Sequence, residues 1–311
     1  MNARRGAPLT VWRFHDGKPG HERQTAGLLA ALARRRPLEV IELDARDCGL
    51  TWWHPLLRRL PAALARRPAP ALVVGAGRAC EWAIFAARRA HRTRAVYLMK
   101  PRLPPRCFDL CLVPQHDGLK AGPHVEPTQG VLNDIVPGTG PRDGPVLVLV
   151  GGPSAHHTWD EAALLRQIAS LVFGRRERRF AISDSRRTPP STAAKLAEFA
   201  QPGVSVHSHL ATPPDWLREA LARAPEAWVT ADSVSMLFEA LSAGCAVGVL
   251  EVPAKRADRI NAIAPALIAG GLVGTLAAWL ADPRLPHLPQ PLAEATRCAE
   301  LVDCRLLGGE P

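Results

Sequence analysis

The stretch EAWVTADSVSMLFEALSAGCAVGVL, residues 226–250, predicts one complete strand–helix–strand unit. Its first five residues and its last five are short apolar runs of the kind found in buried strands. Between them, the apolar residues Met236, Leu237, Ala240 and Leu241 recur at helical spacing and would face a core. Two strands joined through a helix lie parallel in one sheet, so this stretch favours an α/β fold.

The same alternation of apolar runs and helical patterns continues through most of the chain. We expect strands at 9–14, 38–43, 71–76, 94–99, 108–113, 145–152, 178–183, 204–209, 226–230 and 246–250. Helical patterns lie at 24–35, 78–89, 159–173 and 291–307, and we expect only helices after residue 250. The predicted fold class is therefore α/β, with two doubly wound, Rossmann-like domains facing a cleft.

The stretch VPGTGPRDGP, residues 136–145, separates two halves of similar size and has no periodic apolar pattern. Its prolines and glycines are typical of a connection between domains. We therefore expect an N-terminal domain over 1–140 and a second domain over 141–290. Ligands of such sheets bind beyond the carboxyl ends of the strands, so the loops that precede helices are the candidate sites.

The chain is strongly basic, but its composition argues against nucleic acid as a partner. Only five of its 39 basic residues are lysines, it has one tyrosine, and it carries no nucleic-acid motif. Anionic lipid or a phosphate-bearing ligand fits the net charge of +10 at least as well. No signal peptide, no uninterrupted apolar run of about 18 residues and no regular cysteine pattern is present, so we expect a cytoplasmic protein with reduced thiols.

The first candidate site is the stretch DGKPGHE, which begins at Asp16 and follows the first predicted strand. Gly17 and Gly20 would allow a ligand to approach the backbone closely, beside a helix start that offers free amides. His21 is a candidate base near neutral pH, with Asp16 beside it. The alternative is that Asp16 or Glu22 only caps the helix.

The second candidate site is GGPSAHHTWD, which has the same layout in the second half of the chain. Gly151 and Gly152 follow a strongly apolar strand, and Ser154 can cap a helix or bond a phosphate. We expect His156 and His157 to point apart at a helix start, with at least one in solvent. Neither this pair nor the cysteines has metal-ligand spacing, so no metal site is predicted.

Two further loops in the second half complete the prediction. The helix after Thr230 opens with two serines beside free amides, an arrangement suited to a diphosphate, and a glutamate one turn later could accept from ribose hydroxyls. We expect ligand-binding residues here at Asp232, Ser233, Ser235, Met236 and Glu239. Ser185, Arg186 and Arg187 follow another strand and are either phosphate partners or a solvated face.

Five stretches in order along the chain resemble one family: DGKPGHERQ, VPQHD, GGPS, SDSRRTP and TADSVSM with EALSAGCAVGVL behind it. The chain resembles the mitochondrial-fission "elongated mitochondria" proteins and their bacterial relatives. That family looks like glycosyltransferases with two Rossmann-like domains (GT-B). The resemblance implies a nucleotide-sugar site in the second domain, an acceptor site in the first, and a final segment, 291–311, that crosses back to the first domain. We expect no cofactor.

The segment LTWWHPLLRRLPAALARR, residues 50–67, mixes tryptophans and leucines with arginines, and its position would indicate whether the acceptor is linked to a lipid. Such a segment either lies in a membrane interface or packs on the sheet with its arginines in water. Membrane contact would place the protein on the inner face of a membrane and favour a lipid-linked acceptor.

Three functions remain open from the sequence. The first is transfer of a sugar from a nucleoside-diphosphate donor, with His21 or Asp16 as the base and no metal required. The second is a non-catalytic binding or recruiting protein of the mitochondrial-fission type. The third is a sugar-nucleotide epimerase on the same fold.

Overall fold

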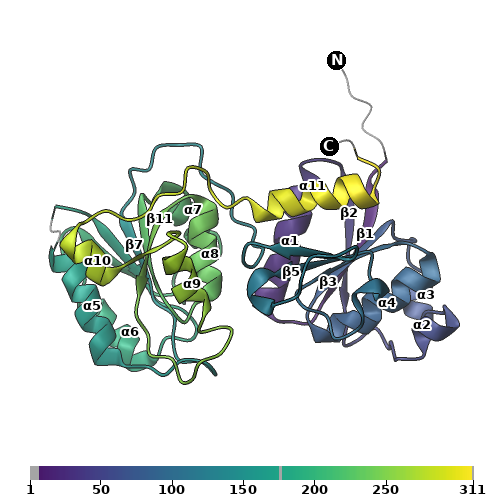
Figure 1. Ribbon diagram of the computed structural model, residues 1–311, viewed down its shortest axis with the longest axis horizontal. Helices are drawn as coiled ribbons and strands as arrows, with labels where there is room; N and C mark the ends of the chain where they lie inside the picture. The colour runs from purple at the N-terminus through teal and green to yellow at the C-terminus, as the bar shows by residue number, and fades with distance from the viewer. Residues whose placement is uncertain (1–6, 175–176, 310–311) are drawn as a thin grey trace, which may run out of the picture. The chain divides into compact units, whose positions relative to one another are not determined.

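The computed structural model describes residues 7–174 and 177–309, and it divides the chain into two compact units (Figure 1). Unit 1 comprises the chain up to Asp134 together with the residues from Ala293 onward. Unit 2 is the continuous stretch Ile135–Leu292. Each unit contains one parallel six-stranded sheet, so the predicted α/β fold class is confirmed.

The sheet of unit 1 has the order β2-β1-β3-β4-β5-β6, and all of its neighbouring strands are parallel. Its strands are β1 Leu9–His15, β2 Leu38–Asp44, β3 Leu72–Ala76, β4 Arg94–Leu98, β5 Leu110–Pro114 and β6 Val125–Thr128. Its helices are α1 Pro19–Ala33, α2 His54–Leu57, α3 Ala62–Ala65, α4 Arg78–His91 and α11 Glu294–Leu306. Single 3-10 turns lie at Pro105–Cys107 and Gln115–Asp117.

Apolar side chains alternate between the two faces of this sheet, so each face has its own core. Val11 packs on the face that α1 and α11 cover, together with Leu28 of α1 and Val302 of α11. The next residue, Trp12, packs on the opposite face, together with Ile84 of α4. Helices therefore cover both faces, which is why the strands read as nearly continuous apolar runs.

The sheet of unit 2 has the order β12-β11-β10-β7-β8-β9 and is also parallel. Its strands are β7 Val146–Leu149, β8 Phe180–Ser183, β9 Val204–His207, β10 Glu226–Thr230, β11 Ala246–Leu250 and β12 Gly274–Thr275. Its helices are α5 Glu161–Gly174, α6 Pro190–Ala197, α7 Trp216–Arg223, α8 Val234–Ala243, α9 Ile263–Ala269 and α10 Leu276–Ala281.

Both strand orders reverse direction at one point, where successive crossovers leave toward opposite edges. In unit 1 this point lies between β1 and β3, and in unit 2 it lies between β7 and β10. The loops on either side of such a point diverge and leave a crevice beyond the carboxyl ends of the strands. Each unit thus has one position at which its topology favours a ligand site.

Several element predictions were wrong in detail. Helix α1 begins at Pro19 rather than near residue 24. Proline suits the first helical turn, and the negative charge of Glu22 interacts favourably with the positive N-terminal end of the helix dipole. The strand β6 was missed because Glu126 and Pro127 interrupt its apolar pattern at the sheet edge. The expectation of helices alone after residue 250 was also wrong, because the two-residue strand β12 pairs with β11.

The stretches at 50–67 and 136–145 also form particular structures. The first contains two four-residue helices, α2 and α3, rather than one long helix, because Pro55 and Pro61 restrict where a helix can begin. The second has no helix or strand and packs on unit 2. There the Arg142 guanidinium donates to the carbonyls of Ala224 (2.7 Å) and Ala243, which lie at the ends of α7 and α8.

Candidate functional site

At the reversal point of unit 1, a buried carboxylate holds a histidine. Asp16 directly follows β1 and is 6% exposed. The His21 ring lies in the first turn of α1, with Nδ1 at 2.9 Å and 3.1 Å from the two Asp16 carboxylate oxygens. An ionised carboxylate is an acceptor only, so in the neutral imidazole it places the proton on Nδ1. Nε2 then carries the lone pair that a base requires.

Gly77, which follows β3, provides the space for this pair. A Cβ atom there would lie 2.7 Å from the Asp16 carboxylate and would overlap His21 Nδ1. Its backbone also has φ +87° and ψ 158°, a combination that essentially only glycine adopts. The Asp16–His21 pair therefore packs directly against Gly77, where the chain leaves β3.

The remaining residues of this first loop are exposed, and two basic side chains lie there, Lys18 of the loop and Arg46 from beyond β2. Lys18 caps α1 through its backbone, its amide donates to Asp16 Oδ1 at 3.2 Å, and no side chain caps the helix. The Arg46 guanidinium lies above Gly17, which has φ +72°. Hydrogen bonds from Arg46 hold the pKa of the Asp44 carboxyl well below its usual range. Gly20 faces open space.

At the reversal point of unit 2, the two glycines after β7 are enclosed by hydroxyls and a carboxylate. The Gly151 amide donates to Thr230 Oγ1 at 2.8 Å, and the Gly152 amide donates to Asp232 Oδ2 at 3.0 Å. Thr188 Oγ1 donates to the Gly151 carbonyl at 2.5 Å. These two amides are therefore occupied within the protein, and the loop is fixed rather than open.

Asp232 is the buried charge at the centre of this cluster. Its side chain is fully buried, and Oδ2 forms an ion pair of 2.6 Å with Arg187, whose side chain is 41% exposed. The other oxygen, Oδ1, is buried and has no hydrogen-bond partner among the described residues. A buried carboxylate oxygen without a donor is costly, so this atom is suited to accept a hydrogen bond from a ligand.

Helix α8 begins immediately beyond Asp232. Ser233 is its N-cap residue, but the Ser233 side chain makes no capping hydrogen bond. The first amides of a helix have no intrahelical acceptor, and they carry the positive end of the helix dipole. Ser235 is exposed and Met236 half-buried in this first turn, whereas Glu239 is buried one turn further along.

The loop GGPSAHH is held down by its own side chains. Ser154 Oγ accepts from the amides of His156 (3.1 Å) and His157 (3.0 Å). The expectation that these histidines open a helix was wrong, because α5 begins only at Glu161. His157 is buried, which lowers its pKa, and the half-buried His156 bonds Asp258 Oδ2 at 2.8 Å.

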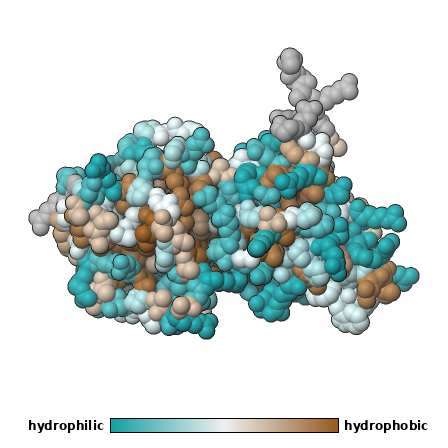
Figure 2. Space-filling model, viewed as in Figure 1, coloured by the Kyte–Doolittle hydropathy of each residue, from teal (hydrophilic) through white to brown (hydrophobic). Residues whose placement is uncertain are grey.

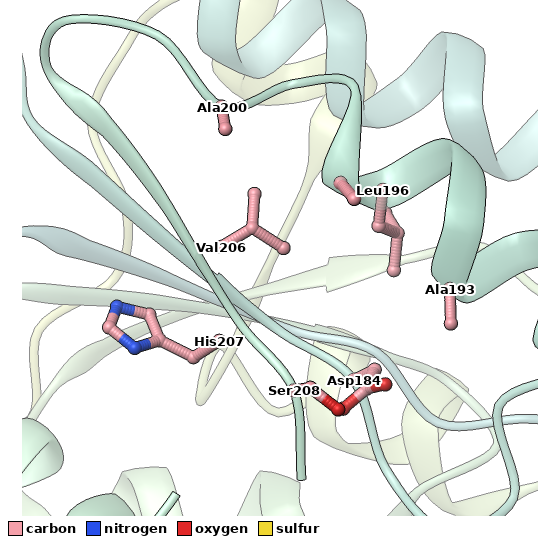
Figure 3. A pocket seen from close by; sticks show the side chains of 8 residues that line it. Asp184, Ala193, Leu196, Ala200, Val206, His207 and Ser208 are labelled. Atoms are coloured by element: carbon pink, nitrogen blue, oxygen red, sulfur yellow. The ribbon is translucent and has the colours of Figure 1, made fainter. Parts of the chain in front are cut away.

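The loop after β8 contributes mainly structural contacts. The Ser185 amide donates to Thr188 Oγ1 at 2.9 Å, and Arg186 is exposed. Beside this loop lies a cavity of about 300 Å³ between α6 and β9 (Figure 3). Figure 3 shows Leu196 and Val206 on its apolar side and Asp184 with Ser208 at its other end. The lining of this cavity shares no residue with the Asp232 cluster.

A family model described as mitochondrial fission ELM1 matches residues 19–306 of the chain. The chain belongs to the mitochondrial fission ELM1 family. The matched range includes His21 and the whole Asp232 cluster. One relative is the uncharacterized protein RP120 of Rickettsia prowazekii (strain Madrid E). It is 22% identical over 94% of this chain and 98% of its own length.

Solved structures share the fold of this ELM1-family chain. A putative UDP-N-acetylglucosamine 2-epimerase from Listeria monocytogenes matches with a TM-score of 0.61 and 14% identity, over 98% of each chain. The UDP-GlcNAc 2-epimerase of Neisseria meningitidis, bound to UDP-GlcNAc, matches with a TM-score of 0.60 and 11% identity, over 97% of this chain and 100% of its own. The glycosyltransferase SnogD from Streptomyces nogalater matches with a TM-score of 0.51 and 14% identity, over 96% of each chain. The family has a GT-B-like fold.

Sequence reasoning missed three residues of these ELM1-family sites. Gly77 was not among the predicted site residues, although it directly follows a strand. Thr188 and Thr230 were seen only as parts of longer stretches, but their hydroxyls fix the Gly151 backbone. Their place at or beyond the ends of strands was the available signal. Among the helices of the described residues, none combines the length and the apolar character needed to span a bilayer.

Proposed function

We propose that this protein binds a nucleoside-diphosphate sugar in unit 2 and transfers the sugar to an acceptor. The observation that carries the proposal is the buried, unpartnered Oδ1 of Asp232 beside the uncapped N-terminus of α8. A sugar nucleotide combines the two chemical features that this site calls for. Its diphosphate suits helix amides, and its hydroxyls are donors for a carboxylate oxygen.

The donor would bind along the loops of unit 2. The diphosphate would bind at the α8 amides, with Ser233 and Ser235 beside it and Arg187 as its counter-charge. Gly151 and Gly152 would allow close approach rather than donate, because their amides already have partners. The remaining predicted residues that would line the site are Ser154, Ser185, Arg186 and Met236. Glu239 would accept a hydrogen bond from a ribose hydroxyl.

In the transfer step, an acceptor hydroxyl would lose its proton to His21 Nε2, and its oxygen would attack the anomeric carbon. The bond from that carbon to the diphosphate oxygen breaks, and the electron pair leaves with the diphosphate. The α8 amides and Arg187 would stabilise the charge that develops there. Asp16 would hold the imidazole in the required tautomer and stabilise the imidazolium, without itself taking the proton.

The test measures turnover of UDP-, GDP-, ADP- and CMP-sugars, with release of the nucleotide as the readout. His21→Ala should lower kcat about 10²- to 10⁴-fold with the productive donor, because it removes the base. Asp16→Asn should also lower kcat, and His15→Gln serves as the matched control because His15 lies outside the pair. Full turnover by His21→Ala would contradict the assignment of the base.

A second candidate is a sugar-nucleotide epimerase, favoured by the similarity in fold to two UDP-GlcNAc 2-epimerases. It needs no acceptor, so an epimerised sugar nucleotide formed without acceptor would support it over transfer. A non-catalytic binding or recruiting function of the mitochondrial-fission type makes a different prediction. Asp232→Asn would then leave partner recruitment unchanged, and no sugar nucleotide would be turned over.

A further inference from the structure

Four large apolar side chains lie in solvent on unit 1, around helix α2. Trp52, Trp53, Leu56 and Leu57 are 64%, 42%, 65% and 59% exposed, and we call these four residues the α2 patch. Figure 2 shows a brown area at the lower right, over the end of unit 1 where Figure 1 draws α2 and α3. Exposed apolar residues scattered singly are ordinary, whereas a cluster marks an interaction surface.

The α2 patch is held in place by two buried residues of its turn, His54 and Pro55. The buried His54 stacks on Trp53, with ring centroids 3.8 Å apart and an angle of 18° between the rings. The Thr51 amide donates to His54 Nδ1 at 3.0 Å, and Pro55 is buried. The apolar side chains are therefore presented by an ordered turn whose anchor points inward.

The surroundings of the α2 patch are strongly basic. No Asp or Glu occurs between residues 48 and 80. Arg58, Arg59, Arg66 and Arg67 are all exposed, and within the described ranges 7–174 and 177–309 none of them forms an ion pair with a carboxylate. An apolar centre with unneutralised guanidinium groups around it matches the boundary between lipid head groups and acyl chains.

We propose that the α2 patch inserts into the interface of a bilayer that contains anionic lipid. The tryptophans and leucines would enter the boundary with the acyl chains, and the arginines would contact the lipid phosphates. A second copy of this chain fits less well, because a symmetric contact would bring the same arginines together. The proposal does not rest on the proposed glycosyl transfer.

The test is co-sedimentation of the full chain with phosphatidylcholine vesicles, with and without phosphatidylglycerol. The wild type should bind the anionic vesicles, and binding should weaken as salt is raised. Leu56→Ser with Leu57→Ser should lower the partition coefficient about tenfold or more, because two leucines leave the apolar phase. Arg58→Gln with Arg59→Gln should lower it roughly fivefold per arginine.

Two matched controls separate the α2 patch from general effects. Leu210→Ser removes an 85% exposed leucine from unit 2, and Arg92→Gln removes an exposed arginine whose φ of 53° matches the 51° of Arg58. Both should bind as the wild type does. The arginine variants keep the test valid if the leucine variant fails to fold.

Three results would overturn the proposal. One is a wild type that binds neither kind of vesicle, and another is equal binding by the wild type and both double variants. The third is a dimer, detected by sedimentation velocity, that the leucine substitutions disperse while vesicle binding is absent. That result would assign the surface to a second copy of the chain.

Discussion

At the scale of single residues, the candidate sites depend as much on glycines, which have no side chain, as on residues with reactive groups. Gly77 leaves room for the Asp16–His21 pair, and Gly151 leaves room for the Asp232 carboxylate. A Cβ atom at Gly151 would lie 2.6 Å from Asp232 Oδ1, and one at Gly152 would overlap the Arg187 carbonyl. Both groups of polar residues therefore require close packing around glycine.

Gly77→Ala should abolish the turnover that depends on His21 and destabilise the protein by roughly 2 kcal/mol or more. The substitution combines a glycine-only backbone with displacement of the Asp16–His21 pair. Gly20→Ala is the matched control, since Gly20 lies in helix α1 with nothing within 4 Å of the added atom. It should stabilise the protein by about 0.5–1 kcal/mol, measured by chemical denaturation. Equal stability and turnover in both variants would contradict the packing argument.

At the scale of elements, helix α11 belongs to unit 1 although its sequence lies beyond unit 2. Its buried residues Cys298, Ala299 and Val302 join the core that α1 covers. At the polar edge of this contact, Asp303 pairs with Arg35 at 2.9 Å and with Arg36. Figure 1 shows α11 alongside α1.

Asp303→Asn should lower the free energy of unfolding by about 1–3 kcal/mol, because it removes a buried charge and with it the ion pairs to Arg35 and Arg36. The loss of stability should not exceed this range, because solvent screens the partly exposed side chains of Arg35 (27% exposed) and Arg36 (25% exposed). The control is Glu300→Gln, whose 51% exposed side chain pairs with Arg35 at 3.5 Å and should matter by less than about 0.5 kcal/mol. An equal effect of the two variants would show that the Asp303 pair is not a structural contact.

At the scale of the whole molecule, the two units repeat one architectural principle with different chemistry. Each has a parallel sheet with a reversal point, and each places polar residues beyond the strands at that point. In unit 1 these residues form a carboxylate–imidazole pair, whereas in unit 2 they form a glycine and carboxylate cluster beside a helix N-terminus.

This division predicts where a sugar nucleotide protects the chain. Hydrogen exchange with saturating donor should slow at the loop after β7 and at the start of α8, because a bound ligand opposes local opening. At about 100 times its Kd, the ligand should also stabilise the protein by about 2.7 kcal/mol. The amides after β1 serve as the internal control and should change less. Protection confined to unit 1 would contradict the placement of the donor.

Much of the fold was readable from the sequence because apolar runs and helical periodicity directly reflect burial. The failures occurred where local pattern is weak, as at Glu126 and Pro127 in the edge strand β6, or at the two-residue strand β12. The loops were located correctly because they follow strands. Their internal bonding was not readable, since Gly151 and its two partners, Thr230 and Thr188, come from three separate parts of the chain.

The sequence by itself determined the alternation of strands and helices, the α/β class, the family and the loops that hold polar residues, because these depend on local periodicity and short motifs. Only the tertiary structure decided the strand orders, and with them which loops meet at each reversal point. It also decided that Asp16 holds His21 above Gly77, that Asp232 keeps one oxygen without a partner, and that the α2 patch stays in solvent. These features depend on contacts between residues distant in sequence, which no local pattern records.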